Sequence, residues 1–201
     1  MKKTYSIALL LIIAIAIGAI TALQINLASQ VVTEDFEQNL GEENFGEWSA
    51  NKQVPQDPNN PGHLVQWHIR RASNISRSGA YSAELFIDGK QDDGTIWLER
   101  KISVKQNAQV RVSVSFWLYS EQESFNTIAD VVAYAGIAKP EVEEDFVAVG
   151  SANEVAGWKN YVYEANVNTD STSEAWVAVG ISVRWETTMT YYIDDVRIET
   201  A

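Results

Sequence analysis

The chain contains no cysteine among its 201 residues. Disulfide bonds, which stabilise many small exported domains, are therefore excluded. If the protein is exported, a packed core or a bound metal ion must stabilise it instead. Beyond an N-terminal segment the chain keeps roughly 170 residues, which is enough for one domain with a sizeable core.

Basic residues are also scarce. The sequence has 15 Lys and Arg against 27 Asp and Glu, which gives a net charge of −12. Binding of nucleic acid or of anionic lipid depends on basic side chains that neutralise phosphates, so both partners are excluded. The acidity itself is compatible with solubility in a saline habitat, and it leaves cations and neutral ligands as candidates.

Residues that could carry catalysis are few. The two histidines, His63 and His68, have no serine or cysteine constellation near them, and both are expected at the surface. Glycoside hydrolysis needs two carboxylates about 5–9.5 Å apart across a cleft. The best candidate, EVEED at Glu141 to Asp145, is typical of a solvated turn. There is no glycine-rich phosphate loop. We therefore expect no enzyme and no catalytic residues, and a jelly-roll glycosidase or lyase is the least favoured function.

The N-terminus has the pattern of an export segment. Lys2 and Lys3 precede an apolar run from Ile7 to Leu23, and acidic residues follow from Glu34 onward. The run is longer than the apolar part of most signal peptides and just long enough to span a membrane as a helix. Residues 1–30 are thus predicted to be a signal anchor or a cleaved signal peptide. The rest would then lie at the cell surface or be secreted.

Residues 31–201 predict an all-β domain, because short alternating segments are separated by turn residues and no helical period is visible. The expected strands are Val31–Phe36, Val65–Ser73, Ala80–Ile87, Thr95–Val104, Gln109–Ser120, Ile128–Ala138, Trp158–Val167, Glu174–Trp185 and Met189–Glu199. An irregular loop is expected at Asn51–His63, which holds three of the four prolines. Strands of this length and spacing favour a two-sheet antiparallel β-sandwich, or jelly roll, preceded by an N-terminal hydrophobic helix.

Alternation assigns the two faces of each strand. The inward sets are Val110, Val112, Val114, Phe116 and Leu118; Ile96, Leu98, Ile102 and Val104; and Val177, Val179, Ile181, Val183 and Trp185. Trp67 and Trp185 are expected in the core. Four other aromatics stand on the polar face of their strands, beside charges and hydroxyls: Trp97, Trp117, Tyr119 and Trp176. These four are candidates for contact with a ligand.

The last strand raises a question of its own. In YYIDDVRIE, strict alternation places Asp194 on the apolar face with Tyr192, Val196 and Ile198. Burial of a carboxylate costs several kcal/mol unless it is paired, hydrogen-bonded or bound to a metal. Asp194 must therefore have a partner of one of these kinds.

Several segments occur in the order seen in a known group of domains. They are VVTEDFEQNLGEENFGEW, SRSGAYSAEL, WLERKISV leading into VRVSVSFWLYS, GWKNYVYEANV and YYIDDVRIE. In this order they resemble the carbohydrate-binding modules of the galactose-binding-like jelly-roll type. The resemblance covers most of the chain after Val31, and it implies a β-sandwich that binds glycan. Such modules are usually attached to an enzyme, whereas this one follows a hydrophobic segment.

The resemblance also implies a structural calcium ion that ties the first strand to the last. Residue by residue, it implies Glu37 and Asp194 as ligands, with Asp35 as a weaker candidate and carbonyl groups from the turn at Ser78 to Ser82. Calcium takes about 6–8 oxygen ligands and would neutralise a buried Asp194. The alternative is that Asp194 accepts hydrogen bonds from backbone N–H groups or from hydroxyls, with no metal.

Two functions remain open. The first is glycan binding, which needs an aromatic platform and planar hydrogen-bonding groups. The candidate residues are Trp97, Trp117, Tyr119 and Trp176, with Arg111, Arg184, Glu99 and Glu164 beside them. The second is a structural or interaction protein that binds a surface protein or assembles with itself, since interfaces also enrich exposed aromatics.

Overall fold

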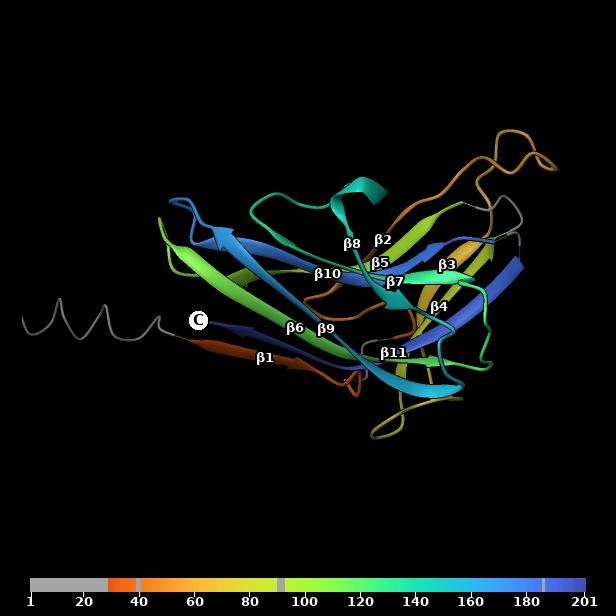
Figure 1. The fold of residues 1–201 in the computed structure, drawn as a ribbon, viewed down its shortest axis with the longest axis horizontal. Coiled ribbons are helices and arrows are strands. Elements are labelled where there is room, and N and C mark those ends of the chain that lie inside the picture. The colour runs from red at the N-terminus through yellow and green to blue at the C-terminus, as the bar shows by residue number, and fades with distance from the viewer. Residues whose placement is uncertain (1–28, 39–40, 90–92, 186) are drawn as a thin grey trace, which may run out of the picture.

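The computed structural model describes residues 29–201 except 39–40, 90–92 and 186. These residues form a two-sheet antiparallel β-sandwich, as the sequence predicts (Figure 1). The N-terminal hydrophobic helix expected within residues 1–30 lies almost wholly outside the described part. Among the described residues there is no helix long and apolar enough to span a membrane.

One sheet has six strands in the order β3-β4-β11-β6-β9, with β1 pairing with β11. Its strands are β1 (Gln30–Glu34), β3 (Trp67–Ala72), β4 (Ser82–Gly89), β6 (Gln109–Ser120), β9 (Gly157–Asn168) and β11 (Thr187–Thr200). We call it the six-stranded sheet. Its strands β6, β9 and β11 are the longest of the described chain, so this sheet offers the broadest outer face.

The second sheet has five strands in the order β2-β5-β10-β7-β8. Its strands are β2 (Ser49–Gln53), β5 (Thr95–Ser103), β7 (Ala129–Gly136), β8 (Val147–Ser151) and β10 (Glu174–Val183), and the 3₁₀ turn η2 (Glu143–Asp145) precedes β8. The sequence predicted the other nine strands but missed β2 and β8. β2 reads SANKQ, which lacks an apolar alternation, and β8 is short and contains Gly150.

The core between the sheets contains the predicted inward sets, with one exception. All the inward residues assigned to β5, β6 and β10, and Val104 just after β5, are buried, and Trp67 packs against them while half-buried. Trp185 is 55% exposed, so its assignment to the core is wrong. The reason is that β10 ends at Val183, and alternation no longer applies two residues later.

A β-bulge in β11 answers the question raised by Asp194. Asp194 pairs with Trp117 and Arg197 pairs with Ser115, so β11 has one residue more than β6 in this interval. Asp195 takes up the extra residue in a left-handed conformation, with φ of 48°. Tyr191 and Ile193 before the bulge face the core, as do Val196 and Ile198 after it. Asp194 therefore lies on the outer face, opposite to the face that alternation predicted.

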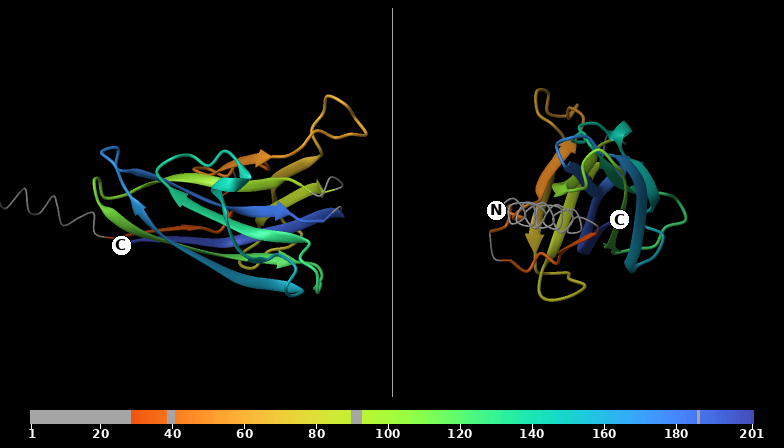
Figure 2. Two further views of the ribbon diagram at one scale, coloured as in Figure 1. Left: turned by 45° about the horizontal axis from the view of Figure 1, so that its top comes forward. Right: turned by 90° about the vertical axis from the view of Figure 1, so that its left-hand side faces the viewer.

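Both ends of the described chain lie at the same end of the sandwich. Gln30 of β1 pairs with Thr200 of β11, and Figure 1 shows the C-terminus beside β1. β4, β6 and β10 end at the opposite end of the sandwich, where β5, β7 and β11 begin (Figure 2).

Candidate functional site

Three aromatic side chains form a row on the outer face of the six-stranded sheet. Trp158 of β9 pairs with Tyr119 of β6, and Tyr119 pairs with Tyr192 of β11. Directly paired residues share a face, so the three rings stand side by side. The ring centroids of Trp158 and Tyr119 are 5.5 Å apart, and those of Tyr119 and Tyr192 are 6.0 Å apart. We call Trp158, Tyr119 and Tyr192 the aromatic row.

The same register continues into a charged group on the next two strands. Tyr192 pairs with Glu84 of β4, and Glu84 pairs with Arg70 of β3. Arg70 Nε donates to Glu84 Oε1 at 2.7 Å, and His68 Nε2 lies 2.9 Å from the same oxygen. We call His68, Arg70 and Glu84 the Glu84 cluster. It places polar groups at the end of the aromatic row.

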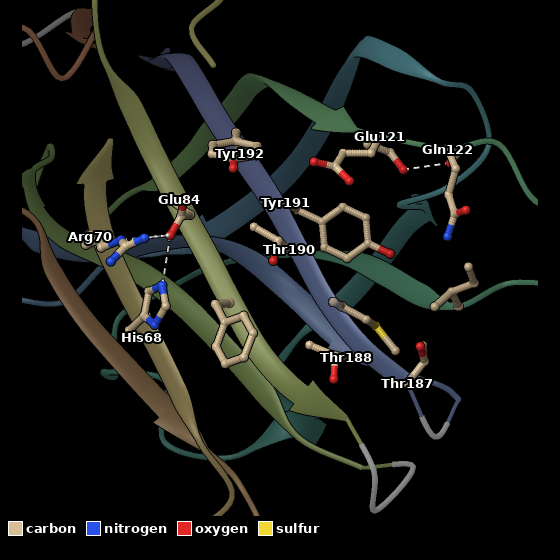
Figure 3. A pocket seen from close by; sticks show the side chains of 14 residues that line it. His68, Arg70, Glu84, Glu121, Gln122, Thr187, Thr188, Thr190, Tyr191 and Tyr192 are labelled. Carbon is tan, nitrogen blue, oxygen red and sulfur yellow. Dashed lines mark hydrogen bonds and ion pairs between the residues drawn. The ribbon is translucent and has the colours of Figure 1, made fainter. Parts of the chain in front are cut away.

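A pocket of about 460 Å³ opens over this part of the sheet. Figure 3 shows the Glu84 cluster at one side, the β11 hydroxyls of Thr188 and Thr190 between, and Glu121 and Gln122 at the other side. β6 ends at Ser120, so from Thr187 to Tyr191 β11 pairs with β4 alone. The departure of β6 thus makes room for the pocket.

Glu84 is 5% exposed and is held in the ionised form by its neighbours. Burial acts to raise the pKa of Glu84, but the hydrogen bond from His68 and the charge of Arg70 outweigh it, so the pKa lies below 4.5. Tyr192, which accepts a 2.7 Å hydrogen bond from Asn74 Nδ2, has its own pKa raised by burial. Near neutral pH the pocket wall therefore presents an ion pair beside a neutral phenol.

Glu84→Gln is expected to lower the free energy of unfolding near neutral pH by about 1–3 kcal/mol, because charge-assisted hydrogen bonds are lost. The folded-state pKa of Glu84 is below its ordinary 4.5, so the wild-type advantage is full above 4.5 and disappears as the pH falls through the folded-state value. Urea unfolding of both proteins from neutral pH downward measures this difference. A difference that stays constant through the acid range would contradict an ionised Glu84.

Three of the predicted ligand residues lie on this face, but only one belongs to the row. Tyr119 is in the row. The guanidinium of Arg77 covers Trp117, 3.8 Å from its ring centroid. Arg111 forms an ion pair with Glu164 and lies eight residues along β6 from Tyr119, which is about 27 Å in an extended strand.

The other three predicted residues lie on the opposite face of the molecule, on the five-stranded sheet. Trp97 is fully buried there, so the expectation that it is exposed is wrong. Residues 137–146, between β7 and β8, cover it. Phe146 packs on Trp97 with ring centroids 4.9 Å apart, and Lys139 binds the buried Glu99 at 2.8 Å.

Trp176 and Arg184 are also engaged on that face. Lys101 and Lys139 lie over the ring of Trp176, at 5.4 and 5.6 Å from its centroid. Arg184 pairs with Asp130 and Glu143. The turn predicted at Glu141 to Asp145 is therefore part of the cover rather than a free loop.

Comparison with known proteins gives a likeness in structure only. No family description matches the sequence, and no curated protein matches it either. A tandem of two family 22 carbohydrate-binding modules from Paenibacillus barcinonensis Xyn10C is similar, with a TM-score of 0.53 and 16% identity over 85% of this chain and 50% of that chain. A structure described as carbohydrate-binding modules of the β-sandwich superfamily has a TM-score of 0.50 and 11% identity over 81% of this chain and 59% of that chain.

The chain has the fold of carbohydrate-binding modules. It spans about half the length of the two chains just compared. A Stig cyclase from Fischerella sp. TAU is also similar, with a TM-score of 0.48 and 10% identity over 86% of this chain and 98% of that chain. The expected absence of catalysis stays a prediction.

The sequence resemblance implied Asp194 and Glu37 as calcium ligands. In the structure both carboxylates accept hydrogen bonds from backbone N–H groups. Asp194 Oδ2 accepts from the N–H of Arg77 and of Ser78 at 2.8 and 3.2 Å, and Oδ1 accepts from Asp195 N–H at 2.7 Å. Glu37 Oε1 accepts from the N–H of Ala80 and of Tyr81, each at 2.8 Å. Both carboxylates thus fasten residues 73–81, the loop between β3 and β4.

These contacts do not make a calcium cage. Calcium needs about 6–8 oxygen ligands, whereas both oxygens of Asp194 and Oε1 of Glu37 already accept N–H donors. Asp35, the weaker candidate, accepts the N–H of Glu37. Among the described residues no group of three or more His, Cys, Asp or Glu side chains could hold a metal ion. The alternative of backbone hydrogen bonds matches the geometry, and calcium stays a prediction for experiment.

Sequence reasoning missed most of the site. Trp158 was assigned to a strand but not to a face, and His68 was taken for an ordinary surface residue. Glu84 could have been found by alternation, because it shares the outer face of β4 with Ser82 and Phe86 while apolar residues flank it. Its meeting with Tyr192 depends on the pairing of β4 with β11, 108 residues apart by numbering (192 − 84), which sequence alone does not reveal.

Proposed function

We propose that the outer face of the six-stranded sheet binds a glycan chain. The observation that carries this proposal is the single register line of Trp158, Tyr119, Tyr192, Glu84 and Arg70 across five strands. The partly exposed rings of Trp158 and Tyr119 give apolar surface on which the C–H face of a sugar stacks, with the buried Tyr192 packed beside them. The polar groups at the end of the line fix the sugar hydroxyls. The fold of carbohydrate-binding modules supports the same function.

The line also suggests how a chain would lie. Neighbouring strands are about 4.8 Å apart, so the line from β9 to β3 covers about 19 Å. The separation between neighbouring strands is close to the length of one pyranose residue in an extended polysaccharide. A linear glycan running across the strands would therefore place about one residue over each strand.

Trp158→Ala and Tyr119→Ala are each expected to weaken binding about tenfold or more, which corresponds to about 1.4 kcal/mol. Both side chains are only partly buried, so their removal leaves the fold intact. The measurement is titration calorimetry of the full chain against a panel of soluble neutral and acidic polysaccharides. Trp176→Ala is the matched control, because it removes a half-buried tryptophan from the opposite sheet.

Two results would overturn the proposal. Loss of binding in Trp176→Ala with retention in Trp158→Ala would move the site to the five-stranded sheet. No binding of any polysaccharide, combined with oligomers that grow with concentration in light scattering, would favour the structural or interaction protein that the sequence left open.

We infer that this binding takes place outside the cytoplasm. The support comes from the sequence alone, in the basic start and the apolar run of Ile7 to Leu23. A polysaccharide or a surface protein is then the accessible partner. Either an anchored or a secreted domain could reach such a partner.

A further inference from the structure

A second cleft lies on the side of the sandwich, where each sheet has an edge. β2 is the edge strand of the five-stranded sheet and β3 is the edge strand of the six-stranded sheet. Both lie on the same side of the molecule (Figure 2, right). The cleft encloses about 640 Å³, a volume typical of sites for small ligands. Its lining includes Glu43, Asn44, Trp48, Ser49, Trp67 and His68.

Trp48 contributes a buried donor without an acceptor. Its side chain belongs to the core and is 3% exposed, yet its indole Nε1–H has no hydrogen-bond partner among the described residues. A buried donor in that state costs about 1–3 kcal/mol, and native structures rarely leave one unpaired. Nε1 itself has no exposed surface, so a ligand oxygen would remove this cost once a shift of the Trp48 ring presents its N–H to the cleft that it lines.

A second buried donor without an acceptor lies next to Trp48. The guanidinium of Arg100 lies 5.6 Å from the centre of the Trp48 ring, and Arg100 Nε is likewise buried without a partner in the described chain. Another guanidinium nitrogen of Arg100 is paired with Glu47. Arg100 does not line the cleft, so Trp48 supplies the unpaired donor that the cleft can offer to a ligand.

Trp67 contributes an apolar surface. It is half-buried, packs against the core and carries the ammonium of Lys52 over its ring, 5.1 Å from the centroid. The lining holds one carboxylate, Glu43, and no lysine or arginine. The ammonium of Lys52 over Trp67 offsets the carboxylate of Glu43, so the cleft carries no net charge, and a neutral polyhydroxyl ligand would meet rings, amide and hydroxyl groups.

We propose that this side cleft is a second ligand site, which takes a neutral sugar. The sugar ring stacks on Trp67, and one of its oxygens accepts the indole N–H of Trp48. The two sites lie on opposite sides of the edge strand β3 and share only His68 among their lining residues. The side cleft therefore does not depend on the glycan chain proposed for the aromatic row.

Indole N–H signals in ¹H–¹⁵N spectra of the full chain test this site, because each of the seven tryptophans gives one signal. Trp48→Phe assigns the Trp48 signal, since it removes the donor and keeps an aromatic ring. Neutral xylo-, manno-, gluco- and galacto-oligosaccharides are titrated, with oligogalacturonate as the acidic comparison. We expect at least one neutral oligosaccharide to shift the Trp48 and Trp67 signals, and we expect this in Trp158→Ala as well.

The outcomes separate the two sites. A Trp48 signal that no neutral oligosaccharide moves, at saturation of the Trp158 signal or at the highest soluble concentration, overturns the side cleft. A Trp48 shift that disappears in Trp158→Ala also overturns it, because the shift would then come from the aromatic row. Shifts of Trp48 with a motionless Trp158 signal would support the cleft and count against the aromatic row. Trp67→Ala should abolish the Trp48 shift while the remaining signals keep their positions, and persistence of the shift would contradict stacking on Trp67.

Discussion

Asp194→Ala is expected to lower the free energy of unfolding by about 3–5 kcal/mol. The substitution leaves the N–H groups of Arg77, Ser78 and Asp195 without the carboxylate that accepts them. Asp194 is fully buried, so water does not replace it without a change in the covering loop. In a domain of this size the loss corresponds to a fall in Tm of roughly 6–20 °C, measured by thermal unfolding.

Asp194→Asn and an exposed control sharpen the test. The asparagine amide turns an NH₂ group toward one set of backbone N–H donors, so its loss should be large as well. Asp170→Ala removes an aspartate that accepts a backbone N–H and a hydroxyl in an exposed turn, and it should shift Tm far less. Equal shifts in the buried and exposed variants would contradict the structural role of Asp194.

A chelator distinguishes hydrogen bonding from calcium binding at the same residue. If the backbone N–H groups alone satisfy Asp194, EDTA leaves the wild-type melting curve unchanged. If calcium is bound as the family resemblance implies, EDTA lowers the wild-type Tm and has no effect on Asp194→Ala. The contacts of Asp194 and Glu37 favour the first result.

Gly180→Ala is expected to be the second most damaging change, with a loss of about 3 kcal/mol or more. Gly180 of β10 pairs with Trp97 of β5. A Cβ atom at Gly180 would lie 2.7 Å from the Cα of Trp97 and closer still to the carbonyl oxygen of Ile96. These are backbone atoms of the neighbouring strand β5, so they cannot rotate away, and urea unfolding should show the full cost.

Gly136→Ala on the adjacent strand is the matched control. There the added Cβ would meet the hydroxyl end of Tyr134, which can turn aside at the loss of one hydrogen bond to Ala138. The expected cost is about 1 kcal/mol. A cost at Gly180 no larger than at Gly136 would mean that Trp97 is not tightly packed against β10.

The sequence predicted those parts of the fold that depend on local alternation. The inward sets of β5, β6 and β10 are correct because each strand keeps a strict period of two between its ends. Alternation failed in β11, where Asp195 adopts a left-handed backbone that aspartate tolerates better than most residues. A bulge inserts one residue, so the residues before it lie on the face opposite to the one that alternation counted from the later residues predicts. No feature of YYIDDVRIE marks that insertion.

The candidate site was harder to predict because it depends on which strands become neighbours. Alternation correctly placed Trp97, Trp117, Tyr119 and Trp176 on outer faces, but it does not say which sheet a strand joins or what covers it. Trp97 and Tyr119 therefore looked equivalent, although the 137–146 segment covers the first and the second stands partly exposed in the aromatic row. Glycine at position 180, under Trp97, was a clue to close packing on that face.

The pairing of Gln30 with Thr200 has a mechanical consequence. A force that pulls these two ends apart acts on the outermost pair of β1 and β11, and each pair that opens transfers the load to the next. The strands would separate one pair at a time, which requires less force than sliding all pairs together. A load applied along β6, by contrast, is resisted at once by its long borders with β9 and β11. The sandwich should therefore yield first at its termini and keep the sheet that carries the aromatic row intact.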